Sequence, residues 1–303
     1  MTTVAVVIPT HNRPELLAVA VDSVLSQQLP ADVTVRAVIV DDASDPPAAE
    51  ALGELADAVV IIRNDTPRGP AAARNQGASA IDADLVAFLD DDDRWLPGKV
   101  QACLSAFNAY PDAALVFHQV AFDWGRHNGA PRMRVVPNPV GRMLHRQPPH
   151  IDGVVVPSHV HKSVRFDESF LAAEDLDYLL RLATSGRVVE LSAVLAVLGT
   201  PVEFPSAISI ASRIAGRRRF QEKHAVLFDR KAKAYSDLRI GHQYRHLGSK
   251  GSAAGAFALA MVRKPLWAAP WKGLLGLALS DRQVARIARS LQRWRPGQPP
   301  TAD

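Results

Sequence analysis

Cysteine is nearly absent from this chain of 303 residues, which contains Cys103 alone. A single cysteine excludes a disulfide within the chain and fits a reducing compartment. Long apolar runs are also missing, since the longest uncharged candidate, residues 251–262, is shorter than the roughly 20 residues that span a bilayer. The first residues lack the basic start and apolar stretch of a signal peptide. We therefore expect a cytoplasmic protein, either soluble or held peripherally at the inner face of the membrane.

Acidic side chains are scarce in the last third of the chain. Residues 207–303 contain 19 Lys and Arg against 5 Asp and Glu, whereas residues 1–206 contain 16 against 26. This split predicts two regions with different partners, a site-bearing domain over 1–206 and a basic α-helical region over 207–303. Basic regions often bind nucleic acid, but no aromatic-interleaved basic groove or nucleic-acid motif accompanies this one. We therefore expect no nucleic-acid partner.

Short apolar runs alternate with helical patterns over the first half of the chain. The five runs expected as strands are residues 4–9, 33–40, 58–62, 85–89 and 113–117. Apolar residues recur at helical spacing, or follow a helix-starting proline, over residues 14–28, 69–80 and 97–108. Repeated β-α units predict an α/β fold with a mostly parallel, twisted sheet flanked by helices.

This alternation stops between His118 and His150, where Pro, Arg and His are frequent. We expect long loops there, and loops of this length in a compact domain are usually functional or disordered. Five arginines fall in the segment: Arg126, Arg132, Arg134, Arg142 and Arg146. They predict either a wall that binds phosphate or carboxylate groups or an ordinary solvated loop, and the sequence leaves both open.

Four consecutive aspartates, Asp90–Asp93, directly follow the apolar run of residues 85–89. In an open α/β sheet, ligands bind at the carboxyl ends of the strands. Crowded carboxylates repel one another, and a bound cation offsets that cost. The acidic tetrad therefore predicts a divalent cation that holds a phosphorylated ligand. The alternative is an acidic turn that caps the following helix.

Further motifs lie beside the expected strand ends. They are Pro9–Arg13 after the first strand, Asp41–Ser44 after the second, Gly69–Gly77 ahead of the fourth, and Glu174–Asp177 at the start of a later helix. Taken in this order with the acidic tetrad, they resemble the family 2 glycosyltransferases, inverting enzymes of the GT-A fold that use nucleotide-sugar donors. The resemblance covers roughly residues 4–200. It implies a nucleotide-sugar-binding half over 1–117 and an acceptor and catalytic-base half over 118–206.

The resemblance implies a set of residues that hold the donor nucleotide. These are Pro9, Thr10, His11, Arg13, Asp41, Arg74 and Asp91. Among them, Arg74 would offset diphosphate charge and Asp91 would accept from the ribose hydroxyls. A carboxylate at Asp41 suits the imide N–H of uracil or thymine, and we favour a UDP-sugar as the donor. For His11 the alternative remains that its ring only packs beside the first helix.

The resemblance also implies a metal site and a catalytic base. Asp92, with Asp90, would ligate Mn²⁺ or Mg²⁺. Asp175 is the expected base and Glu174 the alternative. Three acids in four positions raise one another's pKa, which suits a general base that works near neutral pH. The acceptor-side candidates are Asp93, Asp177 and Arg181, and the last two have the spacing of an i, i+4 ion pair.

The function implied is transfer of a hexosyl or N-acetylhexosaminyl group to an acceptor hydroxyl by single displacement, with metal assistance. The acceptor stays open among a saccharide, a lipid-linked saccharide and a small-molecule glycoside. One alternative is a sugar-phosphate nucleotidyltransferase, which would carry a Gly-rich phosphate loop where this chain has Thr10–Pro14. The other is a non-catalytic sugar-nucleotide binder or scaffold, which would lose the base or metal carboxylates.

The basic C-terminal region has a pattern of its own. Arginines recur on one face of an expected helix over residues 280–294, opposite an apolar face, and tryptophans and lysines interleave just before it. This composition suits a helix at a membrane interface. The alternative is that these helices pack their apolar faces on the rest of the protein.

Overall fold

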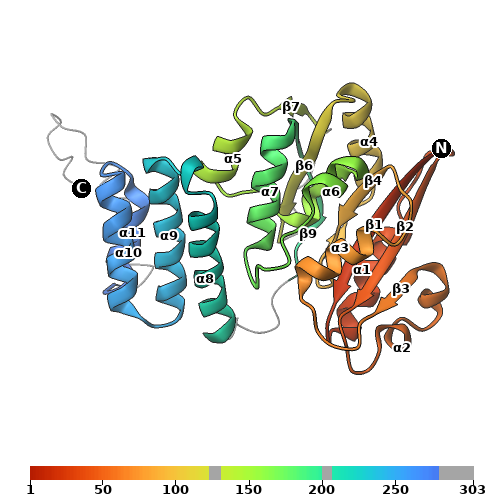
Figure 1. Ribbon diagram of the computed structural model, residues 1–303, viewed down its shortest axis with the longest axis horizontal. Coiled ribbons are helices and arrows are strands. Elements are labelled where there is room, and N and C mark those ends of the chain that lie inside the picture. The colour runs from red at the N-terminus through yellow and green to blue at the C-terminus, as the bar shows by residue number, and fades with distance from the viewer. Residues whose placement is uncertain (123–130, 200–206, 280–303) are drawn as a thin grey trace, which may run out of the picture. The chain divides into compact units, whose positions relative to one another are not determined.

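The computed structural model describes residues 1–122, 131–199 and 207–279. The chain divides into two compact units, Met1–Phe204 and Pro205–Asp303. In the first unit a sheet is flanked by helices, whereas the described part of the second is helical (Figure 1). The helix expected over residues 280–294 lies outside the described residues.

The first unit is built on a nine-stranded sheet with the order β3-β2-β1-β4-β8-β6-β9-β5, in which β7 pairs with β9. Its strands are β1 (Thr2–Thr10), β2 (Val33–Asp41), β3 (Val60–Arg63), β4 (Leu85–Phe88), β5 (Arg94–Trp95), β6 (Ala113–Ala121), β7 (Met133–Val135), β8 (Val154–Pro157) and β9 (Arg187–Val197).

The sheet is parallel through its first four strands and again between β6 and β9. Strand β8 runs antiparallel between β4 and β6. Thr10 pairs with Asp41, and Val7 pairs with Phe88. Because parallel strands end at the same edge, the motifs after β1, β2 and β4 converge there, as the sequence predicted.

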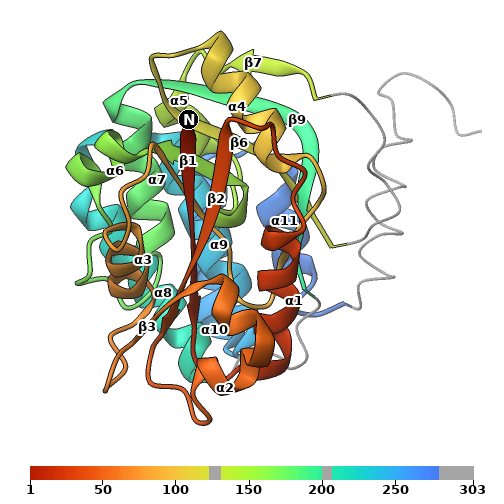
Figure 2. The ribbon, with the colours of Figure 1, turned by 90° about the vertical axis from the view of Figure 1, so that its right-hand side faces the viewer.

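Helices of the first unit cover both faces of the sheet. They are α1 (Pro14–Leu25), α2 (Ala48–Leu52), η1 (Gly53–Ala58), α3 (Pro70–Ala78), α4 (Lys99–Ala109), α5 (Pro139–His145), η3 (Ile151–Gly153), α6 (Ser158–Val164) and α7 (Glu174–Ser185). Helices α3 and α1 lie on opposite sides of β1 and β2 (Figure 2). The small residues of α3 permit close packing, because a Cβ on Gly77 would lie 2.4 Å from Val7 Cγ1.

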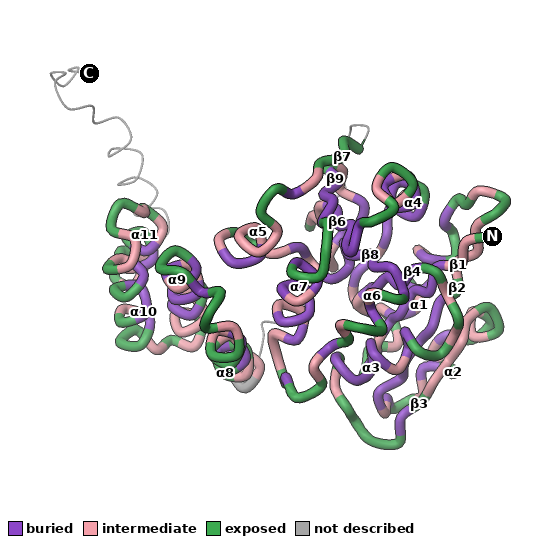
Figure 3. Tube along the Cα trace, turned by 45° about the horizontal axis from the view of Figure 1, so that its top comes forward, coloured by how far each residue is buried: buried purple, intermediate pink, exposed green. Residues whose placement is uncertain are grey.

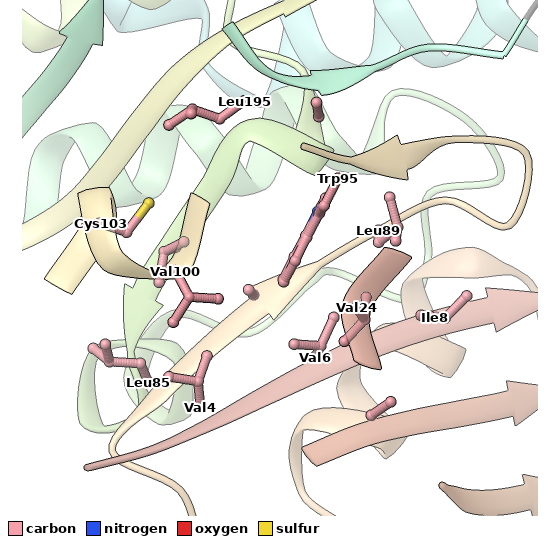
Figure 4. Close-up of a cluster of buried hydrophobic side chains, with 14 of the residues drawn as sticks. Val4, Val6, Ile8, Val24, Leu85, Leu89, Trp95, Val100, Cys103 and Leu195 are labelled. Carbon is pink, nitrogen blue, oxygen red and sulfur yellow. The ribbon is translucent and has the colours of Figure 1, made fainter. Parts of the chain in front are cut away.

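One main core lies under α1 and α4. Val4, Val6 and Ile8 alternate along β1 and meet Leu85 and Trp95 (Figure 4). Full burial of such a side chain stabilises the fold by about 1.5–3 kcal/mol. Cys103 is buried in the same cluster as a free thiol.

The expectation of long loops over residues 118–150 is partly wrong. Strand β6 continues to Ala121, and β7 and α5 add further regular structure. The apolar pattern ends at Phe117, but β6 continues to pair with β9 from a distant part of the sequence. Strand length here is decided by this long-range pairing rather than by local pattern.

The second unit has its own apolar core. Its helices are α8 (Ala207–Lys223), η4 (Ala225–Leu227), α9 (Arg230–His246), α10 (Lys250–Arg263) and α11 (Ala268–Leu275). Phe257 is fully buried, and both Gly241 and Gly273 leave room for its ring. Among the described residues, no helix has the length and apolarity needed to cross a membrane.

Candidate active site

The acidic tetrad meets the motif that follows β1. Thr10 Oγ1 donates to Asp91 Oδ2 over 2.7 Å. Arg13 Nη1 donates to Asp91 Oδ1 and to Asp92 Oδ2, both over 2.9 Å. Burial raises the pKa of Asp91, and the contacts with Thr10 and Arg13 oppose this shift. A cationic group of the protein therefore already bridges two of the four carboxylates.

The end of β9 lies against the same tetrad. Gly199 N donates to Asp93 Oδ1 over 2.6 Å. A Cβ on Gly199 would lie 2.0 Å from the backbone oxygen of Asp92, so this position accepts only glycine without movement of the chain. The tetrad is thus held from two directions by segments that are distant in the sequence.

Arg74 of α3 links the tetrad to the helix that carries the candidate base. Its Nη2 donates to Asp90 Oδ1 over 2.7 Å, and its Nη1 donates to Glu174 Oε1 over 2.8 Å. Burial alone would lower the pKa of Arg74, but the two carboxylates outweigh it and the pKa is raised. Arg74 is 4% exposed, so this is a buried bridge between α3, the end of β4 and α7.

The three acids at the start of α7 have different surroundings. Glu174 is buried against Arg74, as described above. Asp177 is fully buried and accepts from Arg181 Nε over 2.8 Å. Asp175 is partly exposed, and its described hydrogen bond comes from the adjacent amide of Leu176 over 2.8 Å. Of the three, Asp175 is the carboxylate with no ion pair among the described contacts.

The Asp177–Arg181 pair joins two helices. Arg181 also donates to the backbone oxygens of Val164 and Arg165, at the end of α6. The expected i, i+4 pair is therefore present, and it fixes the corner between α6 and α7.

His150 and Asp152 join the site although the sequence analysis did not select them. Asp152 Oδ1 accepts from the amide of Asp90 over 2.8 Å, and its Oδ2 lies 2.9 Å from His150 Nδ1. Burial alone would lower the pKa of His150, but the hydrogen bond and charge of Asp152 raise it to about 9. A lone His-x-Asp in a Pro- and His-rich segment has no distinctive spacing, so only the fold reveals it.

These two residues complete a group that could hold a metal ion. Asp90, Asp93, His150 and Asp152 each offer a ligand atom, and these atoms lie within 4.8 Å of one another. Burial and the nearby Asp152 raise the pKa of Asp90 to about 6, and they raise the pKa of Asp93 as well. A site of carboxylate oxygens and one imidazole suits Mn²⁺ better than it suits a soft metal, which prefers sulfur ligands. Asp92 does not belong to this group.

Lys99 supports the group from inside the protein. It is fully buried at the start of α4, and burial lowers the pKa of its amine to about 7. Its Nζ donates to the backbone oxygen of Asp152 and lies 3.5 Å from the centroid of the Trp95 ring. On the other side, a Cβ on Gly153 would lie 2.8 Å from the His118 oxygen. The turn that carries Asp152 is thus tightly confined.

Asp41, the expected base-binding carboxylate, is buried. Its Oδ1 accepts from Ser44 N over 2.8 Å, while its Oδ2 accepts from Ala48 N over 2.9 Å and from Arg63. Burial would raise the pKa of Asp41, but these hydrogen bonds outweigh it and the pKa is lowered. Both carboxylate oxygens of Asp41 thus already accept hydrogen bonds from the protein, so a nucleobase N–H that contacts Asp41 would have to share one of these oxygens.

His11 is exposed at the same edge of the sheet. Its Nδ1 lies 2.7 Å from the backbone oxygen of Asp42, and its Nε2 lies 3.1 Å from Asn12 Nδ2. The network assigns the proton to Nδ1, which donates, while Nε2 accepts. The ring is held at the edge by these polar contacts, beside Pro9.

Two arginines of the candidate acceptor wall have structural partners. Arg134 and Arg142 both pair with Glu190 of β9. Arg142 also lies over the Phe117 ring, with its Cζ 5.2 Å from the centroid. These contacts connect β7 and α5 to β9. Arg126 lies outside the described residues.

A family model described as glycosyl transferase family 2 matches residues 5–164, more than half of the chain. The chain belongs to this family. The match contains every motif of the first half, from Pro9–Arg13 to the acidic tetrad, together with His150 and Asp152.

Relatives and solved structures agree with this membership. WcaA of Escherichia coli K12, a proposed colanic acid biosynthesis glycosyl transferase, is 26% identical over 77% of this chain and 85% of its own length. An uncharacterized glycosyltransferase of Haemophilus influenzae is 32% identical, over 38% of this chain and 37% of its own. Staphylococcus aureus TarS 1-349 in complex with UDP-GlcNAc has a TM-score of 0.61 at 17% identity, over 97% of this chain and 93% of that one. The TarS likeness shows the fold, and the predicted GT-A class is confirmed.

Proposed function

We propose that this family 2 protein is an inverting glycosyltransferase that moves a hexosyl or N-acetylhexosaminyl group from a UDP-sugar to an acceptor hydroxyl. The observation that carries the proposal is the Arg74 bridge. One buried guanidinium contacts Asp90 of the acidic tetrad and Glu174, the neighbour of Asp175. It holds the start of α7 beside the tetrad, as a displacement between a donor and an acceptor requires.

The donor nucleotide is proposed to lie along the edge formed by the ends of β1 and β2. Its contacts come from Pro9, Thr10, His11, Arg13, Asp41, Arg74 and Asp91, as the family resemblance implies. Arg13 is half-exposed and already contacts two carboxylates, so it is placed to meet a diphosphate. The TarS neighbour in complex with UDP-GlcNAc supports UDP as the nucleotide.

The donor set fits a hard divalent cation, either Mn²⁺ or Mg²⁺, held by Asp92 and Asp90. Their side chains are 39% and 28% exposed, so both can meet a ligand that arrives from solvent. When bound, the cation would offset the charge that develops on the departing diphosphate. Asp152 orients Asp90 by accepting from its backbone amide. Asp93, His150 and Asp152, together with Asp90, are the second candidate position for the metal.

Asp175 is proposed as the general base. The acceptor oxygen forms a bond to the anomeric carbon while the bond from that carbon to the diphosphate breaks, and the acceptor proton passes to the Asp175 carboxylate. Glu174 is committed to Arg74 and Asp177 to Arg181, which favours Asp175 for this role. We place Asp93, Asp177 and Arg181 on the acceptor side, the last two as supports of the α6–α7 corner. The acceptor remains open among a saccharide, a lipid-linked saccharide and a small-molecule glycoside.

The test is a product assay with a panel of UDP-sugars and acceptors, read by mass spectrometry with and without EDTA. We expect UDP release with a new glycoside, lost on chelation and restored by Mn²⁺ or Mg²⁺. Release of pyrophosphate would instead indicate a nucleotidyltransferase. UDP-sugar binding without turnover on any acceptor would indicate a binder.

A further inference from the structure

One end of the helical unit combines exposed apolar and basic side chains. This end contains η4, the start of α9, the end of α10, the turn that follows it and the start of α11. Arg230 Nη2 donates to the backbone oxygen of Val262 over 2.8 Å, which ties the start of α9 to the end of α10. We call this region the apolar-basic end.

Large apolar side chains are exposed at this end rather than buried. Val226 and Leu266 are fully exposed, and Val262 and Trp271 are 68% and 49% exposed. Leu227 and Leu259 add further exposed apolar surface. Figure 3 shows exposed residues along α10 and α11. Large exposed apolar side chains gathered at one end of a folded unit point to an interaction site.

The exposed groups belong to an ordered framework. Trp271 Nε1 donates to the Pro265 oxygen over 3.1 Å, so the indole lies against the turn that carries Leu266. Helix α11 packs through Gly273 onto the buried Phe257 ring. Trp267 and Ala269 of the apolar-basic end pack against the buried cluster of Leu238, Ala253, Phe257 and Ala260. The exposed side chains named above do not belong to that cluster.

The net positive charge of the helical unit indicates that its partner is negatively charged. Residues 207–279 contain 14 Lys and Arg against 3 Asp and Glu. Two of the three acids serve the fold, since Asp237 pairs with Arg263 and Asp229 accepts from the amide of Ala232 at the start of α9. Besides Arg263, which pairs with Asp237, the basic residues at the apolar-basic end are Arg230, Lys231, Lys233, Lys264 and Lys272.

We propose that the apolar-basic end docks on an anionic lipid surface. The valine, leucine and tryptophan side chains enter the boundary between headgroups and acyl chains, and the lysines and Arg230 contact lipid phosphates. The proposed contact is peripheral and reversible, because exposed side chains at the surface of a folded unit make it. The excess of positive charge favours a lipid surface over an uncharged apolar protein partner. The inference is independent of the donor and acceptor proposed above.

The experiment is co-sedimentation of the full chain with vesicles of phosphatidylcholine alone or with 30% phosphatidylglycerol (about one anionic lipid in three). We expect binding to the anionic vesicles that weakens as salt is raised. V262E/L266E and K264E/K272E should each reduce the partition coefficient at least about tenfold. The matched controls V19E and K162E change exposed residues of the first unit and should bind like the parent. Circular dichroism checks that each variant folds.

Three outcomes would overturn the proposal. The first is no binding to anionic vesicles at low salt. The second is a loss of vesicle binding in the control variants as large as in V262E/L266E and K264E/K272E, or no loss of vesicle binding in those two variants. Either result would place the contact elsewhere in the chain. The third is a parent dimer that V262E/L266E converts to a monomer without any change in vesicle binding, which would show that this end joins two copies of the chain.

Discussion

Arg74 and Glu174 are joined by a 2.8 Å hydrogen bond although 100 residues separate them. The same guanidinium reaches Asp90, so one side chain fixes the distance between the acidic tetrad and the start of α7. Neither residue of this pair is the proposed base. Their contact instead fixes the start of α7, which carries the proposed base Asp175, next to Asp90.

Replacing Arg74 tests this bridge. Arg74→Met leaves Asp90 and Glu174 without their buried counter-charge and should lower the free energy of unfolding by about 3–5 kcal/mol in urea denaturation. Arg68→Met is the control, because Arg68 is half-exposed and lies 3.7 Å from a half-exposed Glu168. That exposed pair should contribute less than about 1 kcal/mol. Equal losses in the free energy of unfolding for Arg74→Met and Arg68→Met would contradict a stabilising role for the Arg74 bridge.

Substitutions of Glu174 and Asp175, the two neighbouring acids of α7, should have different effects on turnover and on stability. Asp175→Asn should lower kcat by about 10²–10⁴-fold with donor affinity within a few-fold, because a base acts in the transition state. Glu174→Gln weakens the buried pair with Arg74 and should mainly lower the denaturation midpoint. The measurements are steady-state kinetics and urea denaturation of both variants. Full turnover in Asp175→Asn with no turnover in Glu174→Gln would show that Glu174, rather than Asp175, is the general base.

The position of the cation can be decided by two asparagine variants. If the metal is held with the diphosphate by Asp92, Asp92→Asn abolishes the Mn²⁺ dependence of UDP binding in calorimetry. Asp152→Asn then keeps that dependence and only weakens the support of Asp90. The reverse result, with Asp92→Asn normal and Asp152→Asn insensitive to Mn²⁺, would place the metal among Asp90, Asp93, His150 and Asp152.

His161 should make the first unit sensitive to acid. It is buried among Phe88, Phe166 and Tyr178, and its Nδ1 lies 2.8 Å from the Tyr178 hydroxyl. Burial, followed by the charges of Arg165 and Arg181, lowers its pKa to about 4, against about 6.5 in an unfolded chain. Between these values the unfolded chain binds a proton that the native protein does not. Stability therefore falls as pH falls through this window, by up to about 1.4 kcal/mol per pH unit from this group.

The measurement is urea denaturation at pH 7 and pH 5. His161→Asn should reduce the loss of stability between these two values, whatever its effect at pH 7. His159→Asn, at an exposed position of the same helix, should show the same pH dependence as the parent. An unchanged pH dependence in His161→Asn would reject the assignment.

Much of the fold was predictable because its signals are local. The apolar runs that became β1, β2 and β4 alternate with helices, and parallel strands place their carboxyl ends at one edge. That rule brings Thr10, Asp41 and the acidic tetrad together without any knowledge of side-chain contacts. The extension of β6 to Ala121 had no local signal, because it depends on pairing with β9.

The sequence by itself determined the fold class, the family and the gathering of the acidic motifs, since these depend on short patterns and their order. Only the tertiary structure decided which charges meet. It brought Arg74 between Asp90 and Glu174, placed His150 and Asp152 behind the tetrad, and buried Lys99 beneath them. Such contacts join segments far apart in the chain. Their energies depend on burial and on hydrogen-bond geometry, which no local sequence pattern encodes.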